Sequence, residues 1–156
     1  MSPGKVKTVV PGSNEYLVQH GVSLVGTRSG DGAVAHVLVV EDEPDLLLLL
    51  GVAFEAAGHR VRMAADGDMA LRQLRAERYD VVVLDVMMPV LDGWQVLESL
   101  RHDPDAPPVV VLSAASGAEN RKRAADLGAA GFVGKPVELA TLVQVVEAMA
   151  AQAAHP

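Results

Sequence analysis

The 156-residue sequence contains no cysteine, which excludes both disulfide bonds and zinc sites built from thiolates. It also has few cations, since 13 lysines and arginines face 20 acids and leave a formal net charge of −7. A surface that coats nucleic acid needs clustered lysine and arginine, so no direct nucleic-acid binding is expected. Half of the residues are hydrophobic, which is enough for one domain with a substantial core.

Long hydrophobic runs are missing too. The longest apolar block, "LLLLLGVAF" at 46–54, is about half of the roughly 20 residues that a membrane-spanning helix needs. The N-terminus, "MSPGKVKTVVPGSNEY", lacks the continuous apolar segment of a secretory signal. The sequence therefore predicts a cytoplasmic protein that does not enter a membrane.

Residues 1–35 are rich in glycine, proline and serine and show no sustained hydrophobic period. They are predicted to be a flexible N-terminal extension, with a small hairpin around His20 and Gly21 as the alternative. Residues 36–154 are predicted to form the folded domain.

From His36 onward, short runs rich in β-branched residues alternate five times with helical segments. Runs such as "VVVL" are apolar on both faces, as in strands covered by two helix layers. Strict alternation predicts an α/β domain with a doubly wound, five-stranded parallel sheet of the flavodoxin-like type. The expected strands are 35–40, 59–65, 80–85, 107–114 and 130–135, and the expected helices are 44–58, 66–79, 92–103, 117–128 and 138–154.

Polar side chains stand where four of these strands end: Glu41 and Asp42, Asp85, Ser113, and Lys135. The carboxyl ends of parallel strands share one edge of the sheet, where such folds bind ligands. Of three close carboxylates, one would be protonated unless a cation neutralises them, and oxygen-only donors favour Mg²⁺ as that cation. Taken singly, these residues also suit helix caps, turns or the surface; taken together, they suit phosphoryl transfer.

Four segments carry a resemblance to the receiver domains of two-component response regulators, over about residues 36–154. They are "VLVVEDEPD", "VVVLDVMMPVLDG", "VVVLSA" and "GFVGKP". The resemblance implies that Asp85 accepts a phosphoryl group from a phosphohistidine, on a sensor histidine kinase or a histidine phosphotransfer protein. It implies that Lys135 pairs with a phosphoryl oxygen. It also implies that Mg²⁺ is held by Glu41, Asp42, Asp85 and the backbone carbonyl of Met87.

The same resemblance implies a switch. Ser113 would turn toward the phosphoryl group, and Phe132, where tyrosine is common, would follow by rotating inward. The face formed by 117–128, 130–135 and 138–154 would then change its binding of a downstream protein, and could also support a weak homodimer. The expected role is that of a signalling receiver and not of an enzyme. No output domain follows the last expected helix, which predicts either a stand-alone receiver or a fragment of a longer regulator.

Three other functions would require different residues. A receiver-like module that binds partners without being phosphorylated would usually lack an acid or the lysine. A phosphatase of the haloacid-dehalogenase type would place a second aspartate two residues after its nucleophile, where this chain has Met87. A cofactor-binding flavodoxin-like module would need a loop rich in serine, threonine and glycine in place of "EDEPD".

Two surface patterns stay open. Leu46 to Leu50 point in every direction around their helix, so some are either simply exposed or part of a docking patch for the helical bundle of a kinase. Arg121, Lys122 and Arg123 are expected to form a solvated face, with an acidic partner segment as the alternative. Trp94 is expected to be structural.

Overall fold

The computed structural model describes residues 34–88 and 91–153. The predicted extension lies outside the described residues except for Val34 and Ala35. All ten expected elements are present, and each begins and ends within three residues of its predicted bounds. The strands are β1 (His36–Val40), β2 (Arg60–Ala64), β3 (Val81–Asp85), β4 (Val109–Ser113) and β5 (Gly131–Gly134); the helices are α2 (Pro44–Ala56), α3 (Gly67–Ala76), α4 (Gly93–Arg101), α5 (Ala118–Asp126) and α6 (Leu139–Ala153).

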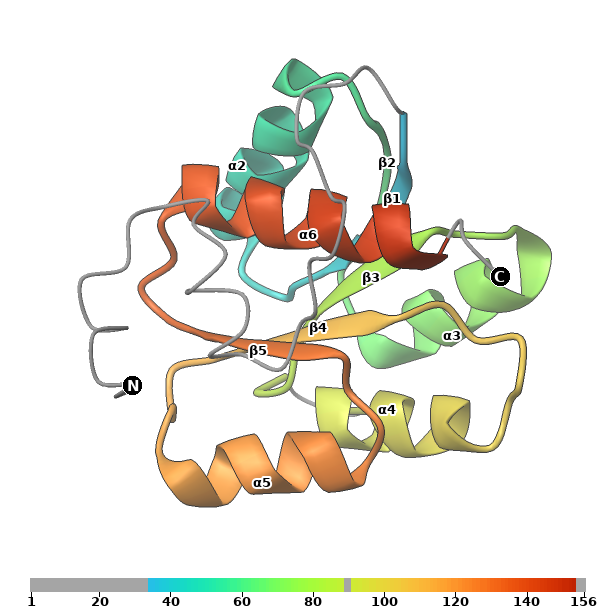
Figure 1. The fold of residues 1–156 in the computed structure, drawn as a ribbon, viewed down its shortest axis with the longest axis vertical. Coiled ribbons are helices and arrows are strands. Elements are labelled where there is room, and N and C mark those ends of the chain that lie inside the picture. The colour runs from blue at the N-terminus through green and yellow to red at the C-terminus, as the bar shows by residue number, and fades with distance from the viewer. Residues whose placement is uncertain (1–33, 89–90, 154–156) are drawn as a thin grey trace, which may run out of the picture.

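The five strands form one parallel sheet in the order β2-β1-β3-β4-β5. Helices α2 and α6 cover one face, and α3, α4 and α5 cover the other (Figure 1). This arrangement confirms the predicted doubly wound fold.

The central strands are buried on both faces, because helices cover both sides of the sheet. Every residue of β3 and β4 is buried. Along β3, Val81 and Val83 join the core under α2 and α6, whereas Val82 and Leu84 join the core under the other three helices. This alternation explains why the strand sequences are apolar throughout.

The register of the sheet decides which residues meet at its carboxyl edge. Val40 of β1 pairs with Leu84 of β3, so the next residues, Glu41 and Asp85, come side by side. The chain leaves β1 for β2 on one side, while β3 lies on the other. This is the topological switch point at which doubly wound sheets form a crevice.

Side-chain caps fix where the helices begin. Glu43 accepts a hydrogen bond from the backbone N–H of Leu46 (2.7 Å), and Pro44 occupies the first turn of α2. Asp92 and Gln95 form a reciprocal capping box at the start of α4. Among the described residues, no helix combines the length and apolar character needed to span a bilayer.

Candidate functional site

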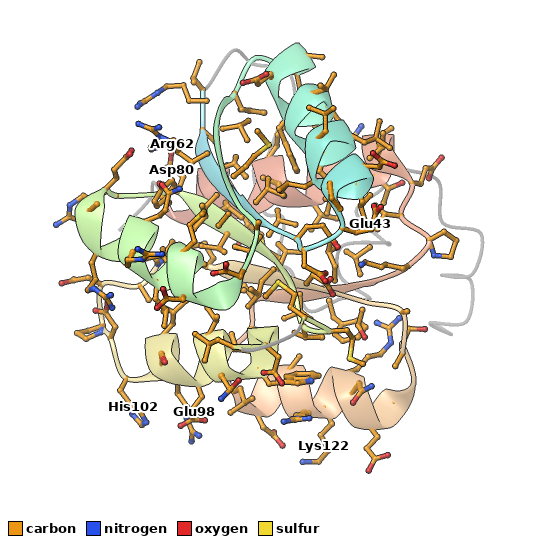
Figure 2. The ribbon with its side chains drawn as sticks, turned by 180° about the vertical axis from the view of Figure 1, so that it is seen from behind. Glu43, Arg62, Asp80, Glu98, His102 and Lys122 are labelled. Atoms are coloured by element: carbon orange, nitrogen blue, oxygen red, sulfur yellow. The ribbon has the colours of Figure 1, made fainter. Side chains whose placement is uncertain are left out.

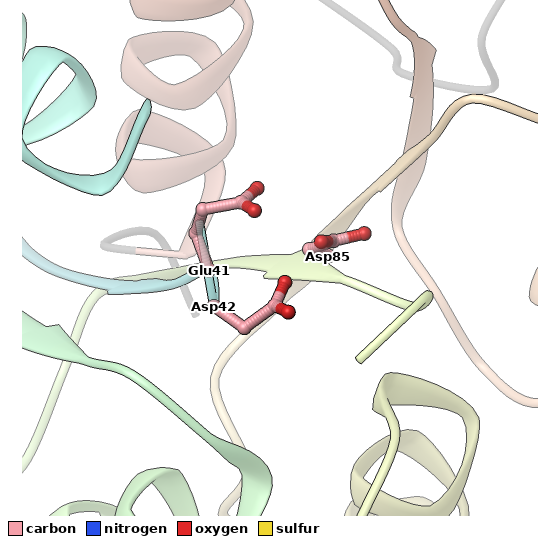
Figure 3. A group of neighbouring side chains, drawn as sticks. All are labelled: Glu41, Asp42 and Asp85. Atoms are coloured by element: carbon pink, nitrogen blue, oxygen red, sulfur yellow. The ribbon is translucent and has the colours of Figure 1, made fainter. Parts of the chain in front are cut away.

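Three carboxylates converge at the carboxyl edge of the sheet. Glu41 and Asp42 follow β1 and Asp85 ends β3, and one oxygen from each lies within 4.8 Å of the others (Figure 3). Glu41 and Asp85 are only 1% and 2% exposed, whereas Asp42 reaches solvent. The sheet register therefore produces a compact acidic group that is open on one side.

Lys135, directly after β5, is the cation beside this group. Its Nζ donates a hydrogen bond to Oε1 of Glu41 (3.0 Å) and lies 3.3 Å from Oδ2 of Asp85. Burial lowers the pKa of Lys135, but the two carboxylates outweigh burial, so the pKa is raised overall. The side chain is therefore charged at neutral pH.

Glu41 is the most buried acid of the group. Burial raises its pKa and the charge of Asp85 adds to that effect, while hydrogen bonds from Lys135 and from the backbone N–H of Glu43 oppose it. If all four groups are ionised, one ammonium leaves two of the three negative charges uncompensated. Such a set of oxygen donors fits a hard divalent cation such as Mg²⁺.

Asp85 is held by its own loop and by α4. Its Oδ1 accepts a hydrogen bond from the backbone N–H of Met87 (3.0 Å). The backbone of Gly93, at the start of α4, passes so close that any β-carbon there would collide with the carbonyl oxygen of Asp85. A glycine at position 93 is therefore needed for the end of β3 and the start of α4 to meet.

Ser113 ends β4, and its hydroxyl stays on its own loop. It is fully buried, donates a hydrogen bond to the carbonyl of Ala115 and accepts one from the N–H of Ala115, both at 3.0 Å. Phe132 on β5 is 5% exposed, so its ring already occupies the inward position. Of the predicted site residues, the structure brings together Glu41, Asp42, Asp85 and Lys135. The hydroxyl of Ser113 is turned toward Ala115. Pro89, in the segment quoted after Asp85, lies outside the described residues.

Two arginines of α5 lie over aromatic rings, and of these Arg121 is partly buried whereas Arg123 is exposed, as expected. The guanidinium of Arg121 lies over the ring of Phe132, 4.9 Å from its centroid, and that of Arg123 lies over Trp94 at 4.2 Å. Lys122 is exposed as well: it lies on the outer side of α5 (Figure 2) and pairs with Asp126. The sequence carries no signal for either stack, since each joins α5 to a residue of another element.

Comparisons of the sequence and of the structure with known proteins both point to the receiver family that the sequence motifs resemble. A family model described as the response regulator receiver domain matches residues 37–147. The transcriptional regulatory protein PrrA of Mycobacterium tuberculosis is 42% identical over 113 residues, which is 72% of this chain and 48% of that protein. The transcriptional activator protein PfeR of Pseudomonas aeruginosa is 36% identical over 133 residues, or 85% of this chain and 42% of that protein. The chain thus spans about half the length of the curated relatives it matches.

Two solved structures have the same fold. The receiver domain of a Francisella response regulator superposes with a TM-score of 0.73 at 32% identity, covering 76% of this chain and 98% of that one. The chemotaxis response regulator CheY4 of Vibrio cholerae gives a TM-score of 0.70 at 28% identity, with 75% and 99% coverage.

Proposed function

This chain belongs to the response regulator receiver domain family of two-component signalling, and on that basis we propose that Asp85 accepts a phosphoryl group from a phosphohistidine donor. One observation carries the proposal: Asp85 lies at the switch point of the sheet, among two further carboxylates and 3.3 Å from the ammonium of Lys135. An isolated buried carboxylate would be costly, whereas one mounted beside a cation is suited to nucleophilic attack.

In the proposed reaction, a carboxylate oxygen of Asp85 attacks phosphorus. The P–O bond to Asp85 forms as the P–N bond of the donor breaks, and the departing imidazole nitrogen takes up a proton. The Met87 N–H and the packing against Gly93 hold the nucleophile still, which is most of what phosphoryl transfer asks of a protein. Lys135 would turn from Glu41 toward an oxygen of the incoming group.

Glu41, Asp42 and Asp85, with the backbone carbonyl of Met87, are the residues that would hold Mg²⁺. When bound, Mg²⁺ neutralises the negative charge that builds up on the transferred group. Asp42 is the acid of the three that reaches solvent, so it stands where a hydrated cation would enter.

Phosphorylation is proposed to act as a switch on the surface formed by α5, β5 and α6. Ser113 would leave Ala115 and bond a phosphoryl oxygen, and the loop between β4 and α5 would move with it. That surface would then bind a downstream protein, and a weak homodimer on the same surface belongs to this proposal.

The proposed donors are a sensor histidine kinase or a histidine phosphotransfer protein in the cytoplasm. The matched relatives are named as transcriptional regulators, and this chain covers about half of each. The proposal includes no direct contact of nucleic acid with residues 34–88 or 91–153.

The test is the intact mass of the protein after treatment with acetyl phosphate, with and without Mg²⁺. The wild type should gain one phosphoryl group only with Mg²⁺, Asp85→Asn should gain none, and the exposed control Asp68→Asn should behave as the wild type. If Asp85→Asn is still modified, another residue is the acceptor. If the wild type gains nothing under any condition, the chain is an unphosphorylated interaction module.

A further inference from the structure

Arg121 of helix α5 contacts the interior of the protein. Arg121 is only partly exposed, and its guanidinium covers the ring of Phe132, which is 5% exposed on β5. Phenylalanine has no hydroxyl, so no hydrogen bond from the ring can fix its position. The ring is therefore held by packing and by the cation above it.

Arg121 makes a second contact, to the loop between β4 and α5. Its Nε donates a hydrogen bond to the carbonyl of Ser116 (3.0 Å). One residue earlier, Nδ2 of Asn120 donates to the carbonyl of Ala115 (3.0 Å), which also accepts the hydroxyl of Ser113. Side chains from the first turns of α5 thus hold the loop on which the proposed switch depends.

The loop is pressed against β5 from the other side. A β-carbon at Gly134 would lie 2.9 Å from Cβ of Ser116, so only glycine allows this approach. The backbone N–H of Lys135 donates to the carbonyl of Ser113 (2.9 Å). Phe132, the loop and the lysine of the site therefore belong to one packed unit, and Arg121 contacts both its aromatic ring and its loop.

We propose that Arg121 is a positioning residue of the receiver switch: it holds the ring of Phe132 in the buried position and, through Ser116, fixes the loop that follows Ser113. The link to phosphorylation rests on the proposed function. The effect on Phe132 in the resting protein does not. Loss of Arg121 should allow the ring to leave its buried position, because one contact would be lost from the ring and another from the loop.

The chain is well suited to a direct test, because it contains only two phenylalanines, Phe54 and Phe132. Labelling with 4-fluorophenylalanine gives two ¹⁹F resonances, which Phe54→Leu would assign. In Arg121→Gln, saturation-transfer ¹⁹F measurements should detect a displaced Phe132 population about two- to five-fold larger than in the wild type. The resonance of Phe54, in the core on the opposite face, should not change.

Two variants separate Arg121 from a general effect of charge. Arg123→Gln removes the same charge from the same helix, but its guanidinium lies over Trp94, so Phe132 should behave as in the wild type. Arg121→Lys keeps the charge but loses the planar group and Nε, so it should restore the buried ring in part. An unchanged Phe132 resonance and exchange in Arg121→Gln, or an equal change in Arg123→Gln, would overturn the proposal.

A further measurement tests whether Arg121 acts in the phosphorylation switch. With acetyl phosphate and Mg²⁺, the displaced population in Arg121→Gln should fall, because Ser113 turning toward the phosphoryl group leaves space that the ring fills. Intact mass is recorded on the same samples. If the wild type carries no phosphoryl group, the proposed function fails, while the resting ¹⁹F spectra still decide whether Arg121 holds Phe132. If phosphorylated Arg121→Gln keeps its displaced population, phosphorylation does not draw the ring inward, and the link between Arg121 and the switch is overturned.

Discussion

Lys135 lies closer to Glu41 than to the proposed phosphoacceptor. Its Nζ is 3.0 Å from Glu41 and 3.3 Å from Asp85, and both acids are almost fully buried. One ammonium therefore serves two carboxylates in the resting protein, and a third, Asp42, adds to the repulsion. The site is electrostatically unfavourable for folding, which is what makes it attractive to a cation.

We expect Glu41→Gln to stabilise the fold at neutral pH. Lys135 and the N–H of Glu43 bond different oxygens of Glu41, so the single amide oxygen of the variant keeps only one of these hydrogen bonds, but the buried charge is removed. Burial raises the pKa of Glu41, so the folded state holds this proton more tightly than the unfolded state. The ionised form then lowers the free energy of unfolding as the pH rises through and above the ordinary value of 4.5.

Urea unfolding of the wild type and of Glu41→Gln between pH 4 and pH 7 checks this. The gain in free energy of unfolding from Glu41→Gln should be largest at pH 7 and shrink toward pH 4, where Glu41 of the wild type is protonated. The exposed control Glu98→Gln should show no such trend. A variant that is less stable than the wild type at pH 7 would mean that the Lys135 ion pair outweighs the cost of burial.

Helix α2 presents leucines both to the core and to solvent. Leu50 and Phe54 are fully buried, whereas Leu48, Leu49 and Val52 are 60%, 49% and 53% exposed. The five consecutive leucines therefore include an exposed pair, as expected for leucines that point in every direction around a helix. Together with Val52, Leu48 and Leu49 form an exposed apolar patch. A contiguous patch of this kind is typical of a surface that binds another protein.

We expect the double variant Leu48→Gln, Leu49→Gln to lose about tenfold in phosphotransfer from a histidine kinase, the scale of truncating central interface residues. Its rate with acetyl phosphate should stay that of the wild type, since a small donor needs no docking surface. The measurement uses the kinase that labels the wild type fastest in a panel. Unfolding should change by no more than about 0.5 kcal/mol, as for other surface substitutions. Equal loss with both donors would place the leucines in the fold and not in docking.

At the opposite end of the sheet, His59 joins the residue before β1 to α6. Its Nδ1 accepts a hydrogen bond from the N–H of Ala35 (3.0 Å), so Nε2 carries the proton and donates to Glu147 (2.7 Å). His59→Leu would leave a buried N–H and a half-buried carboxylate without this partner. We expect a loss of about 1–3 kcal/mol in urea unfolding, against no measurable loss for the exposed His102→Leu. A neutral His59→Leu would show that water replaces the ring.

These elements show what sequence could and could not predict. The five strands and five helices follow from local hydrophobic period and caps, which act within a few residues. The positions of the site residues at the strand ends follow from the same pattern. The contacts of Arg121 with Phe132 and of Ala35 with His59 join parts of the chain that are 11 and 24 positions apart. Such pairs depend on how the helices and loops pack against the sheet, and neither hydrophobic period nor secondary-structure propensity predicts that packing.

The molecule as a whole gathers its acids from β1 and β3 and its lysine from β5, so the site exists only when the sheet is complete. A cation that binds this site binds the folded chain and not the unfolded one. Binding and folding are therefore linked, and stability reports the cation without any need for phosphorylation.

We accordingly expect Mg²⁺ to stabilise the protein by about 2.7 kcal/mol at a concentration a hundred times its Kd. Thermal unfolding in a Mg²⁺ titration at constant ionic strength measures this. Asp42→Asn should lose most of the gain, because it removes the solvent-facing ligand, while Asp68→Asn, on the outer surface of α3, should keep it. Before any Mg²⁺ is added, Asp42→Asn should be more stable than the wild type, since one repelling charge is gone. A gain from Mg²⁺ that is equal in both variants would place the bound cation elsewhere than among Glu41, Asp42 and Asp85.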